Sequence, residues 1–122
     1  MKIAIPVNEK NQKTDVCLSF GRSPYFLIYD TETDESLFLD NTAASSTGGA
    51  GIKAAQFIID SQVDALLLLS CGQNANQVLK KANIKMYEAI NATAPDNIKA
   101  FKDGELPLLN NIHPGYHRHG GN

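Results

Sequence analysis

A cysteine at the start of a predicted helix is the residue of this chain whose position most clearly favours chemistry. Cys71 lies in "LLLLSCGQNANQVL", between an apolar stretch typical of a buried strand and a stretch with helical periodicity. The positive end of a helix dipole lowers the pKa of a thiol and favours the thiolate, which attacks electrophiles and binds soft metals. We therefore expect Cys71 to be the most reactive group. The alternative is a buried thiol that packs as a small apolar side chain.

A glycine-rich loop, "STGGAGIKAAQFI" over residues 46–58, offers a second kind of chemistry. Gly48, Gly49 and Gly51 precede a helix-forming stretch, and the backbone N–H groups at a helix start attract anions. The pattern read from Gly49 resembles a dinucleotide fingerprint, but the next strand ends in Ser70 and Cys71 instead of the acid that holds a ribose. The loop is therefore predicted to bind a small anion, or only to allow positive φ in a tight turn.

Further candidate ligand-binding residues lie in the long polar loop 8–24 and after Cys71. Cys17 could supply a second thiolate, and Arg22 could donate two hydrogen bonds to an anion. Asn74 could cap its own helix or contact the ligand. Unstructured loops of this length are usually functional or mobile, and loop 8–24 is expected to open on the same edge of the sheet as Cys71.

The three histidines of the chain, His113, His117 and His119, all lie in its C-terminal segment. Imidazole suits Zn, Ni, Cu and Fe, so these residues join Cys17 and Cys71 as candidate metal ligands. A cysteine hydrolase needs a base beside its thiol, and this placement gives little support for one. Residues 110–122 are predicted to form a flexible tail outside a single domain of residues 1–109.

The elements that must position these residues alternate in a regular order. Strands are expected over residues 2–7, 25–30, 36–41, 64–70 and 84–89, and helices over 50–60, 74–82 and from 93 to Gly104. The order β-β-β-α-β-α-β-α predicts an α/β fold with a five-stranded mixed sheet of order 3-2-1-4-5 and three helices.

Strand direction and helix-capping residues then place the candidate site. Loops 8–24, 41–49, 70–74 and 89–93 all fall at the edge where the parallel strands end, which is where open α/β sheets bind ligands. Ser46 or Thr47 is available to cap the first helix, and Thr93 to cap the last.

Composition narrows the function classes. The chain has 122 residues, 11 Lys and Arg against 13 Asp and Glu, and a net charge of −2. This balance favours neither a nucleic acid nor an anionic membrane as partner. The N-terminus lacks the pattern of a signal peptide, which predicts a cytoplasmic protein with both cysteines reduced.

Several segments taken together resemble one known family. The segments "MKIAIPVN", "SFGRSPYFLIYD", "TGGAGIKAAQFI", "CGQNANQVLKKANIKMYEA" and "FKDGEL" occur in the order found in the dinitrogenase iron–molybdenum cofactor biosynthesis family. This family includes NifX-like and NafY-like carriers and the C-terminal domain of NifB. The resemblance covers about residues 1–109. Members often have a histidine before the Phe-Gly pair, where this chain has Ser19.

The resemblance implies a ribonuclease-H-like fold and a non-catalytic protein that binds or carries an iron–sulfur or iron–molybdenum-type cluster. It also implies cluster-assembly proteins as partners. The cluster-binding residues would then be Cys17, Ser19, Arg22, Gly48, Gly49, Gly51, Cys71 and Asn74. A cofactor-free interaction or regulatory domain is the second hypothesis. A small-anion or nucleotide-binding protein is the third.

Overall fold

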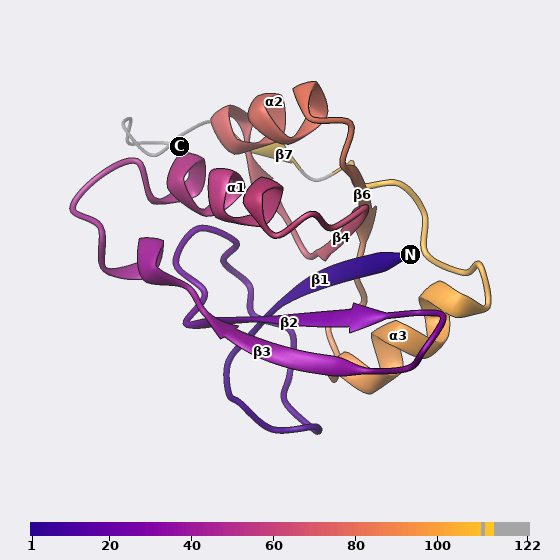
Figure 1. The fold of residues 1–122 in the computed structure, drawn as a ribbon. Helices are drawn as coiled ribbons and strands as arrows, with labels where there is room; N and C mark the ends of the chain where they lie inside the picture. The colour runs from indigo at the N-terminus through magenta and orange to yellow at the C-terminus, as the bar shows by residue number, and fades with distance from the viewer. Residues whose placement is uncertain (111, 114–122) are drawn as a thin grey trace.

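The computed structural model describes residues 1–110 and 112–113, and the backbone only at His113. Over these residues the chain forms a five-stranded sheet, a two-stranded sheet and three α-helices (Figure 1). The elements are, in order, β1 (Lys2–Val7), β2 (Tyr25–Asp30), β3 (Ser36–Asp40), the 3-10 helix η1 (Thr42–Ser45), α1 (Ala50–Asp60), β4 (Ala65–Leu68), β5 (Cys71–Gly72), α2 (Gln73–Lys81), β6 (Lys85–Glu88), α3 (Ala94–Lys102) and β7 (Ile112–His113).

The large sheet has the order β3-β2-β1-β4-β6, which confirms the predicted strand order. The fifth predicted strand is labelled β6 because the short strand β5 precedes it. Strands β1, β2 and β3 pair antiparallel, whereas β4 is parallel to both β1 and β6. The ribonuclease-H-like classification stays a prediction.

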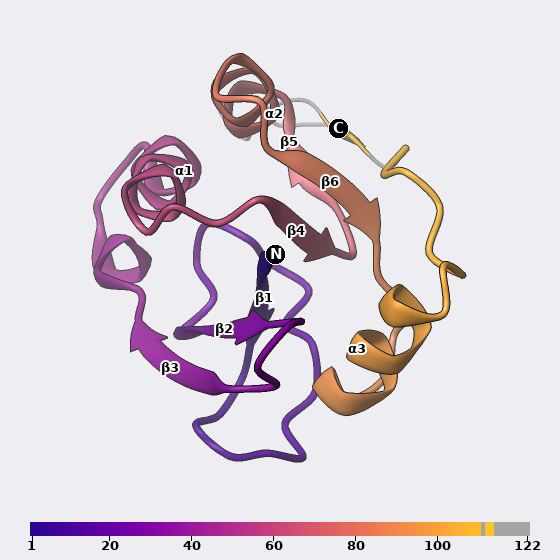
Figure 2. The same cartoon turned by 45° about the vertical axis from the view of Figure 1, so that its right-hand side comes forward.

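Helices cover both faces of this sheet (Figure 2). Helices α1 and α2 pack side by side on one face, where Ala4, Leu66 and Leu68 contribute to the core. Helix α3 covers the other face, above Ile3, Ile5 and Leu67. Neighbouring residues of β1 and β4 therefore point into different cores, as expected for strands buried on both sides. No helix in the described part of the chain is long and apolar enough to cross a membrane.

The structure confirms only some of the predicted helix caps. Thr93 caps α3 as predicted, because its hydroxyl accepts a hydrogen bond from the backbone N–H of Asp96 at 3.2 Å. The expected cap of α1 by Ser46 or Thr47 is wrong, since the N-cap is Gly49 and no side chain caps the helix. The glycine loop places Ser46 too far back along the chain, where its hydroxyl instead donates to the carbonyl of Gly48 at 2.6 Å.

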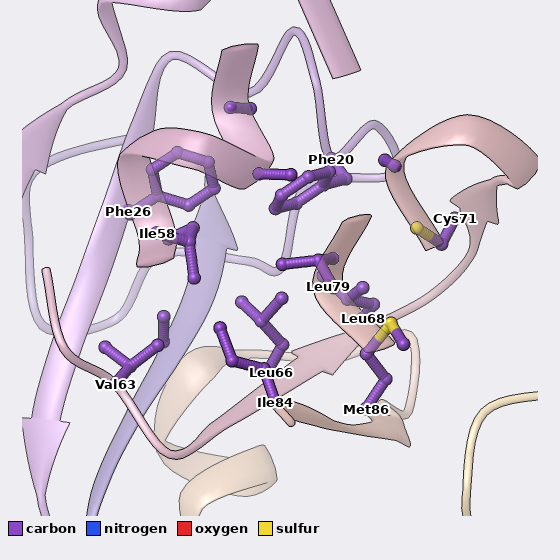
Figure 3. Packing of buried hydrophobic residues seen from close by; sticks show 14 of the residues in the cluster. Phe20, Phe26, Ile58, Val63, Leu66, Leu68, Cys71, Leu79, Ile84 and Met86 are labelled. Carbon is purple, nitrogen blue, oxygen red and sulfur yellow. The ribbon is translucent and has the colours of Figure 1, made fainter. Parts of the chain in front are cut away.

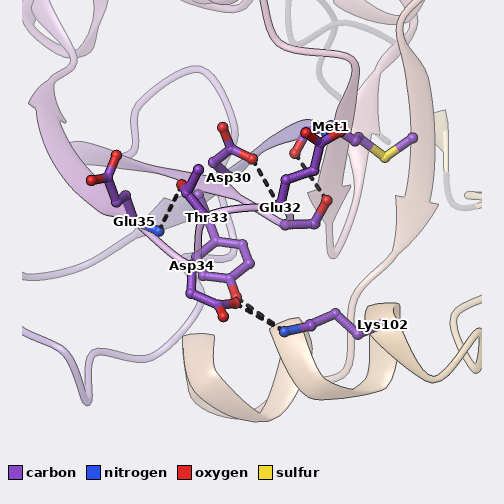
Figure 4. Close-up of polar contacts among 9 residues, drawn as sticks. Met1, Asp30, Glu32, Thr33, Asp34, Glu35 and Lys102 are labelled. Atoms are coloured by element: carbon purple, nitrogen blue, oxygen red, sulfur yellow. Dashed lines mark hydrogen bonds and ion pairs between the residues drawn. The ribbon is translucent and has the colours of Figure 1, made fainter.

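The turn between β2 and β3 is tied to helix α3 by a polar cluster (Figure 4). Lys102 contacts Asp34 with its ammonium group at 3.0 Å, and the Tyr29 hydroxyl donates to the same carboxylate. The hydrogen bond to Asp34 is the main reason that the pKa of Tyr29 lies above its usual value. This cluster holds the hairpin at the end of the sheet remote from the predicted site.

The predicted long loop 8–24 is anchored to the body of the protein. Val16 bridges to Val7 of β1, and its backbone N–H donates to the carbonyl of Ala92 at 3.1 Å. The backbone N–H of Cys17 donates to Pro6 at 2.8 Å. These contacts position the loop's second half, which carries Ser19 and Arg22, at the predicted edge.

Candidate functional site

A cleft of about 850 Å³ opens at the edge of the sheet where the predicted loops meet. Three segments form its walls: the loop that includes Leu18–Arg22, the start of α1 and the start of α2. The lining residues are Leu18, Ser19, Phe20, Gly21, Arg22, Thr47, Gly48, Gly49, Ala50, Gly51, Ile52, Ser70, Cys71, Gly72, Asn74 and Ala75. None of these described residues carries a carboxylate.

The start of α1 presents unpaired backbone donors to this cleft. Gly49 takes a left-handed conformation with φ of 68° and begins the helix without a side-chain cap. The first intrahelical hydrogen bond runs from the N–H of Lys53 to the carbonyl of Gly49 at 3.0 Å. The N–H groups of Ala50, Gly51 and Ile52 therefore have no acceptor among the described residues, as expected for an uncapped helix start.

The start of α2 repeats this arrangement beside it. Its N-cap is Gly72, again without a side-chain cap, so the alternative that Asn74 caps this helix is wrong. Asn74 is the second residue of the helix, two positions after the N-cap, and it lines the cleft instead. Strands β3 and β4, which precede α1 and α2, run in the same direction. The starts of both helices line the same cleft, so the positive ends of both dipoles meet there.

Arg22 adds a formal positive charge. Its Nη1 atom donates to the carbonyls of Ala44 and Ser46 at 2.9 and 3.0 Å. These bonds fix the guanidinium while leaving the Nε and Nη2 donors without a partner in the described structure. Ser19 serves the local turn, because its hydroxyl accepts a hydrogen bond from the backbone N–H of Arg22 at 3.0 Å.

Two residues that the sequence did not single out hold this loop against α1. A Cβ atom on Gly21 would come to 2.8 Å from the backbone nitrogen of Gly51, so only glycine fits there. The buried Asn41 side chain donates to the carbonyls of Gly21 and Ser23 at 3.0 and 2.8 Å. It also accepts from the N–H of Ala43 at 3.1 Å. The glycine in the "SFGRSP" segment was the available sequence signal of this close contact. Nothing in the sequence indicates which segment Gly21 packs against.

The side chain of Cys71 packs among the buried apolar side chains beside the cleft (Figure 3). Its side chain is 1% exposed and belongs to the apolar cluster that includes Phe20 and Leu79. Burial raises the pKa of Cys71 to about 11. The expectation that the helix dipole lowers this pKa is wrong, because the cost of placing a thiolate among apolar side chains exceeds the stabilisation from the dipole.

The cleft brings together most of the predicted site residues. Among the eight predicted cluster-binding residues, it is lined by Ser19, Arg22, Gly48, Gly49, Gly51, Cys71 and Asn74. Cys17 is half-buried and does not line the cleft. His117, His119 and the side chain of His113 lie outside the described structure. Within it, no three His, Cys, Asp or Glu residues are grouped so that they could hold a metal ion.

Comparison with known sequences identifies the family to which this chain belongs. The family model described as dinitrogenase iron-molybdenum cofactor matches residues 1–104, which include every residue that lines the cleft. The chain belongs to this family. The predicted family resemblance is thereby confirmed.

Several proteins that are similar to this chain have known structures. It is 30% identical to the uncharacterized protein MJ0580 of Methanocaldococcus jannaschii over 109 residues, which cover 87% of this chain and 89% of the relative. The apo form of the orange protein from Desulfovibrio gigas has a TM-score of 0.85 and 29% identity, over 90% and 93% of the two chains. The Thermotoga protein TM1290, of the DUF35 family, has a TM-score of 0.79 and 34% identity over 98% of both.

Proposed function

We propose that this protein binds and carries an anionic metal–sulfur complex, of the iron–sulfur or iron–molybdenum type, without catalysing a reaction on it. The observation that carries the proposal is the meeting of two uncapped helix starts and Arg22 around one cleft that lacks a lining carboxylate. Such a surface attracts negative charge. Membership in the dinitrogenase iron-molybdenum cofactor family supports a metal–sulfur complex as the anion.

The cleft residues fit the outer atoms of such a complex. Backbone N–H groups at Ala50, Gly51 and Asn74 would donate hydrogen bonds to its sulfides, and the free donors of Arg22 would do the same. This arrangement does not use thiolate ligation by Cys71, because its side chain is buried in the apolar cluster. We further propose that the complex arrives from, or leaves to, other proteins of cluster assembly, since the cleft is open to solvent.

A second candidate function is a cofactor-free interaction domain, and one observation favours it. Leu18 and Ile52, at the mouth of the cleft, are 70% and 45% exposed. Exposed apolar side chains beside unpaired polar groups are typical of a protein-binding surface. On this hypothesis the cleft would receive a side chain or a terminus of a partner protein.

Anaerobic reconstitution with iron and sulfide, followed by desalting, separates the two functions. The carrier hypothesis predicts visible absorbance and a fixed ratio of iron to protein. Arg22→Ala should weaken retention about ten-fold or more, because a charge-assisted hydrogen bond contributes about 1.5–3 kcal/mol. Lys80→Ala removes the same charge from the far end of α2 and should change little. Colourless, iron-free protein would overturn the carrier hypothesis in favour of the interaction domain.

A further inference from the structure

The chain covers one edge of the large sheet and leaves the other edge open. Residues 107–109 run along β6, where the carbonyl of Pro107 accepts a hydrogen bond from the N–H of Glu88 at 2.8 Å. The N–H of Leu109 donates to the carbonyl of Met86 at 2.9 Å. Strand β3 forms the other edge (Figure 2), and no strand in the described part of the chain pairs with its outer side.

The hydrogen bonds of the hairpin show which backbone groups of β3 face outward. In an antiparallel pair, successive residues direct their N–H and C=O groups alternately toward the partner strand and away from it. The carbonyl of Glu35 accepts from Asp30 at 2.9 Å, and the N–H of Asn41 donates to Pro24 at 3.0 Å, so the odd-numbered residues face β2. The outward groups, which have no partner among the described residues, are those of Ser36, Phe38 and Asp40.

The side chains of β3 make this edge apolar and leave it unprotected. Leu37 is 51% exposed, and Phe38 and Leu39 are only half-buried. The strand contains no Lys and no Pro, and no β-bulge interrupts its pairing with β2, although these features commonly protect an exposed edge. Its one charged residue, Asp40, is the last of the strand and forms an ion pair with Lys10 at 2.9 Å. Such an edge is a template for a further strand.

We propose that β3 pairs antiparallel with the β3 strand of a second copy of this chain, so that two five-stranded sheets join into one. In the two-fold register centred on Phe38, this residue lies opposite the partner's Phe38, and Ser36 lies opposite the partner's Asp40. Each of the three outward residues of one chain then exchanges two hydrogen bonds with an outward residue of the other, which gives six in all. A slide of one strand by two residues leaves one outward residue of each chain without a partner in β3.

The second copy fits this edge because the edge is complementary to itself, as a two-fold interface requires. Asp40 faces a hydroxyl of the partner, so no like charges lie opposite each other, whereas a register centred on Asp40 would pair two carboxylates. The exposed Leu37 lies opposite the partner's Leu39, a residue that packs against the core beneath α1. No residue of β3 lines the cleft, so both clefts stay open and the inference does not depend on what they bind.

Sedimentation equilibrium of the full chain, from about 10 μM to about 1 mM, tests the dimer. We expect the dimer fraction to rise with concentration. Leu37→Lys places a charge at the centre of the interface and should raise the dissociation constant about ten-fold or more. Ile90→Lys is the matched control, because it adds the same charge at a residue that is 46% exposed and lies outside β3, and it should dimerise like the unmodified protein. A chain that stays monomeric up to the highest concentration would overturn the inference, as would equal dimerisation of the Leu37→Lys variant.

Amide hydrogen exchange measured by NMR locates the interface. The amides of Ser36, Phe38 and Asp40 should exchange about ten-fold more slowly in a sample that is mostly dimer than in a dilute one, because they exchange from the monomer. The amides of Leu37 and Leu39 donate to β2 in both samples and should change much less. A dimer in which the three outward amides still exchange fast would overturn the inference by placing the interface elsewhere. Slow exchange of these amides in dilute monomer would also overturn it, since another segment of the same chain would then cover β3.

Discussion

Gly21 lies so close to Gly51 that a Cβ atom on Gly21 would come within 2.8 Å of the Gly51 backbone nitrogen. Gly51 is one of the residues whose N–H group is free at the start of α1. The contact therefore sets the distance between the Arg22 loop and the donors of the helix. The width of the cleft depends on two residues without side chains.

Substitution Gly21→Ala should destabilise the protein and widen this gap. A methyl group there meets backbone atoms that cannot move aside, and overpacking of this kind typically costs about 1–3 kcal/mol. Urea denaturation monitored by circular dichroism measures the change in the free energy of unfolding. Gly48→Ala is the matched control, because a Cβ at Gly48 has open space within 4 Å. Equal stabilities for the two variants would contradict the close contact.

Substitution Asn41→Asp should disrupt the same loop from the other side. The new carboxylate would face the carbonyl oxygens of Gly21 and Ser23, which now accept hydrogen bonds from the Asn41 amide. Leaving buried polar groups without a hydrogen-bond partner lowers the free energy of unfolding by about 1–3 kcal/mol, and by more when one of them is charged. Thermal unfolding should show the loss at pH 7 and a smaller loss at acidic pH, where the new acid is protonated. Asn91→Asp, on an exposed residue, controls for the added charge.

The burial of Cys71 should make it slow to react in the folded protein. Its pKa is raised to about 11, so thiolate is scarce at pH 8. Iodoacetamide labelling followed by mass spectrometry should modify the half-buried Cys17 first, and Cys71 only after unfolding. Rapid labelling of Cys71 in native protein would show that the cleft opens to its sulfur.

The same shift predicts a pH dependence of stability. Folding raises the pKa of Cys71 from an ordinary 9.0 to about 11, so the unfolded chain loses this proton first as the pH rises. Stability should therefore fall between these two values, because the folded state binds more protons. In a Cys71→Ala variant this contribution should be absent. Comparing denaturation curves of the two proteins at several alkaline pH values isolates it.

Removal of the Asp34 charge should lower the pKa of Tyr29. The hydrogen bond to Asp34 is the largest cause of the raised value, followed by burial. Ultraviolet titration of tyrosinate in Asp34→Asn should show one residue titrating at lower pH than in the unmodified protein. Tyr29→Phe identifies that residue in the titration. An unchanged curve would mean that the hydrogen bond between Tyr29 and Asp34 does not persist in solution.

The strand order was predictable because each of its signals is local. The apolar run at 65–68 indicates a strand buried on both faces, and the short turn at 31–35 indicates a hairpin. Strand direction then follows from connectivity, which places the glycine loop, the Arg22 loop and Asn74 at one edge. The positions of these candidate residues therefore required no knowledge of side-chain packing.

The properties that depend on distant segments were not predictable. The pKa of Cys71 is set by Phe20, Leu79 and their neighbours, which are far apart in sequence. Strand β7 is two residues long and has no periodic pattern, so its pairing with Cys71 and Gly72 left no local signal. The support that Asn41 gives to Gly21 likewise spans 20 residues.

The parallel arrangement of α1 and α2 has a consequence for the empty protein. Two helices side by side with their positive ends together repel each other at the cleft, and an anion bound there offsets the repulsion. A ligand that binds only the folded state stabilises that state. Once the ligand concentration exceeds the dissociation constant, the gain in the free energy of unfolding grows with the logarithm of the concentration. Loaded and empty molecules would then differ in melting temperature and in their resistance to proteases. A thermal-shift curve or a timed protease digest thus becomes a measure of occupancy, even for a ligand that has no colour.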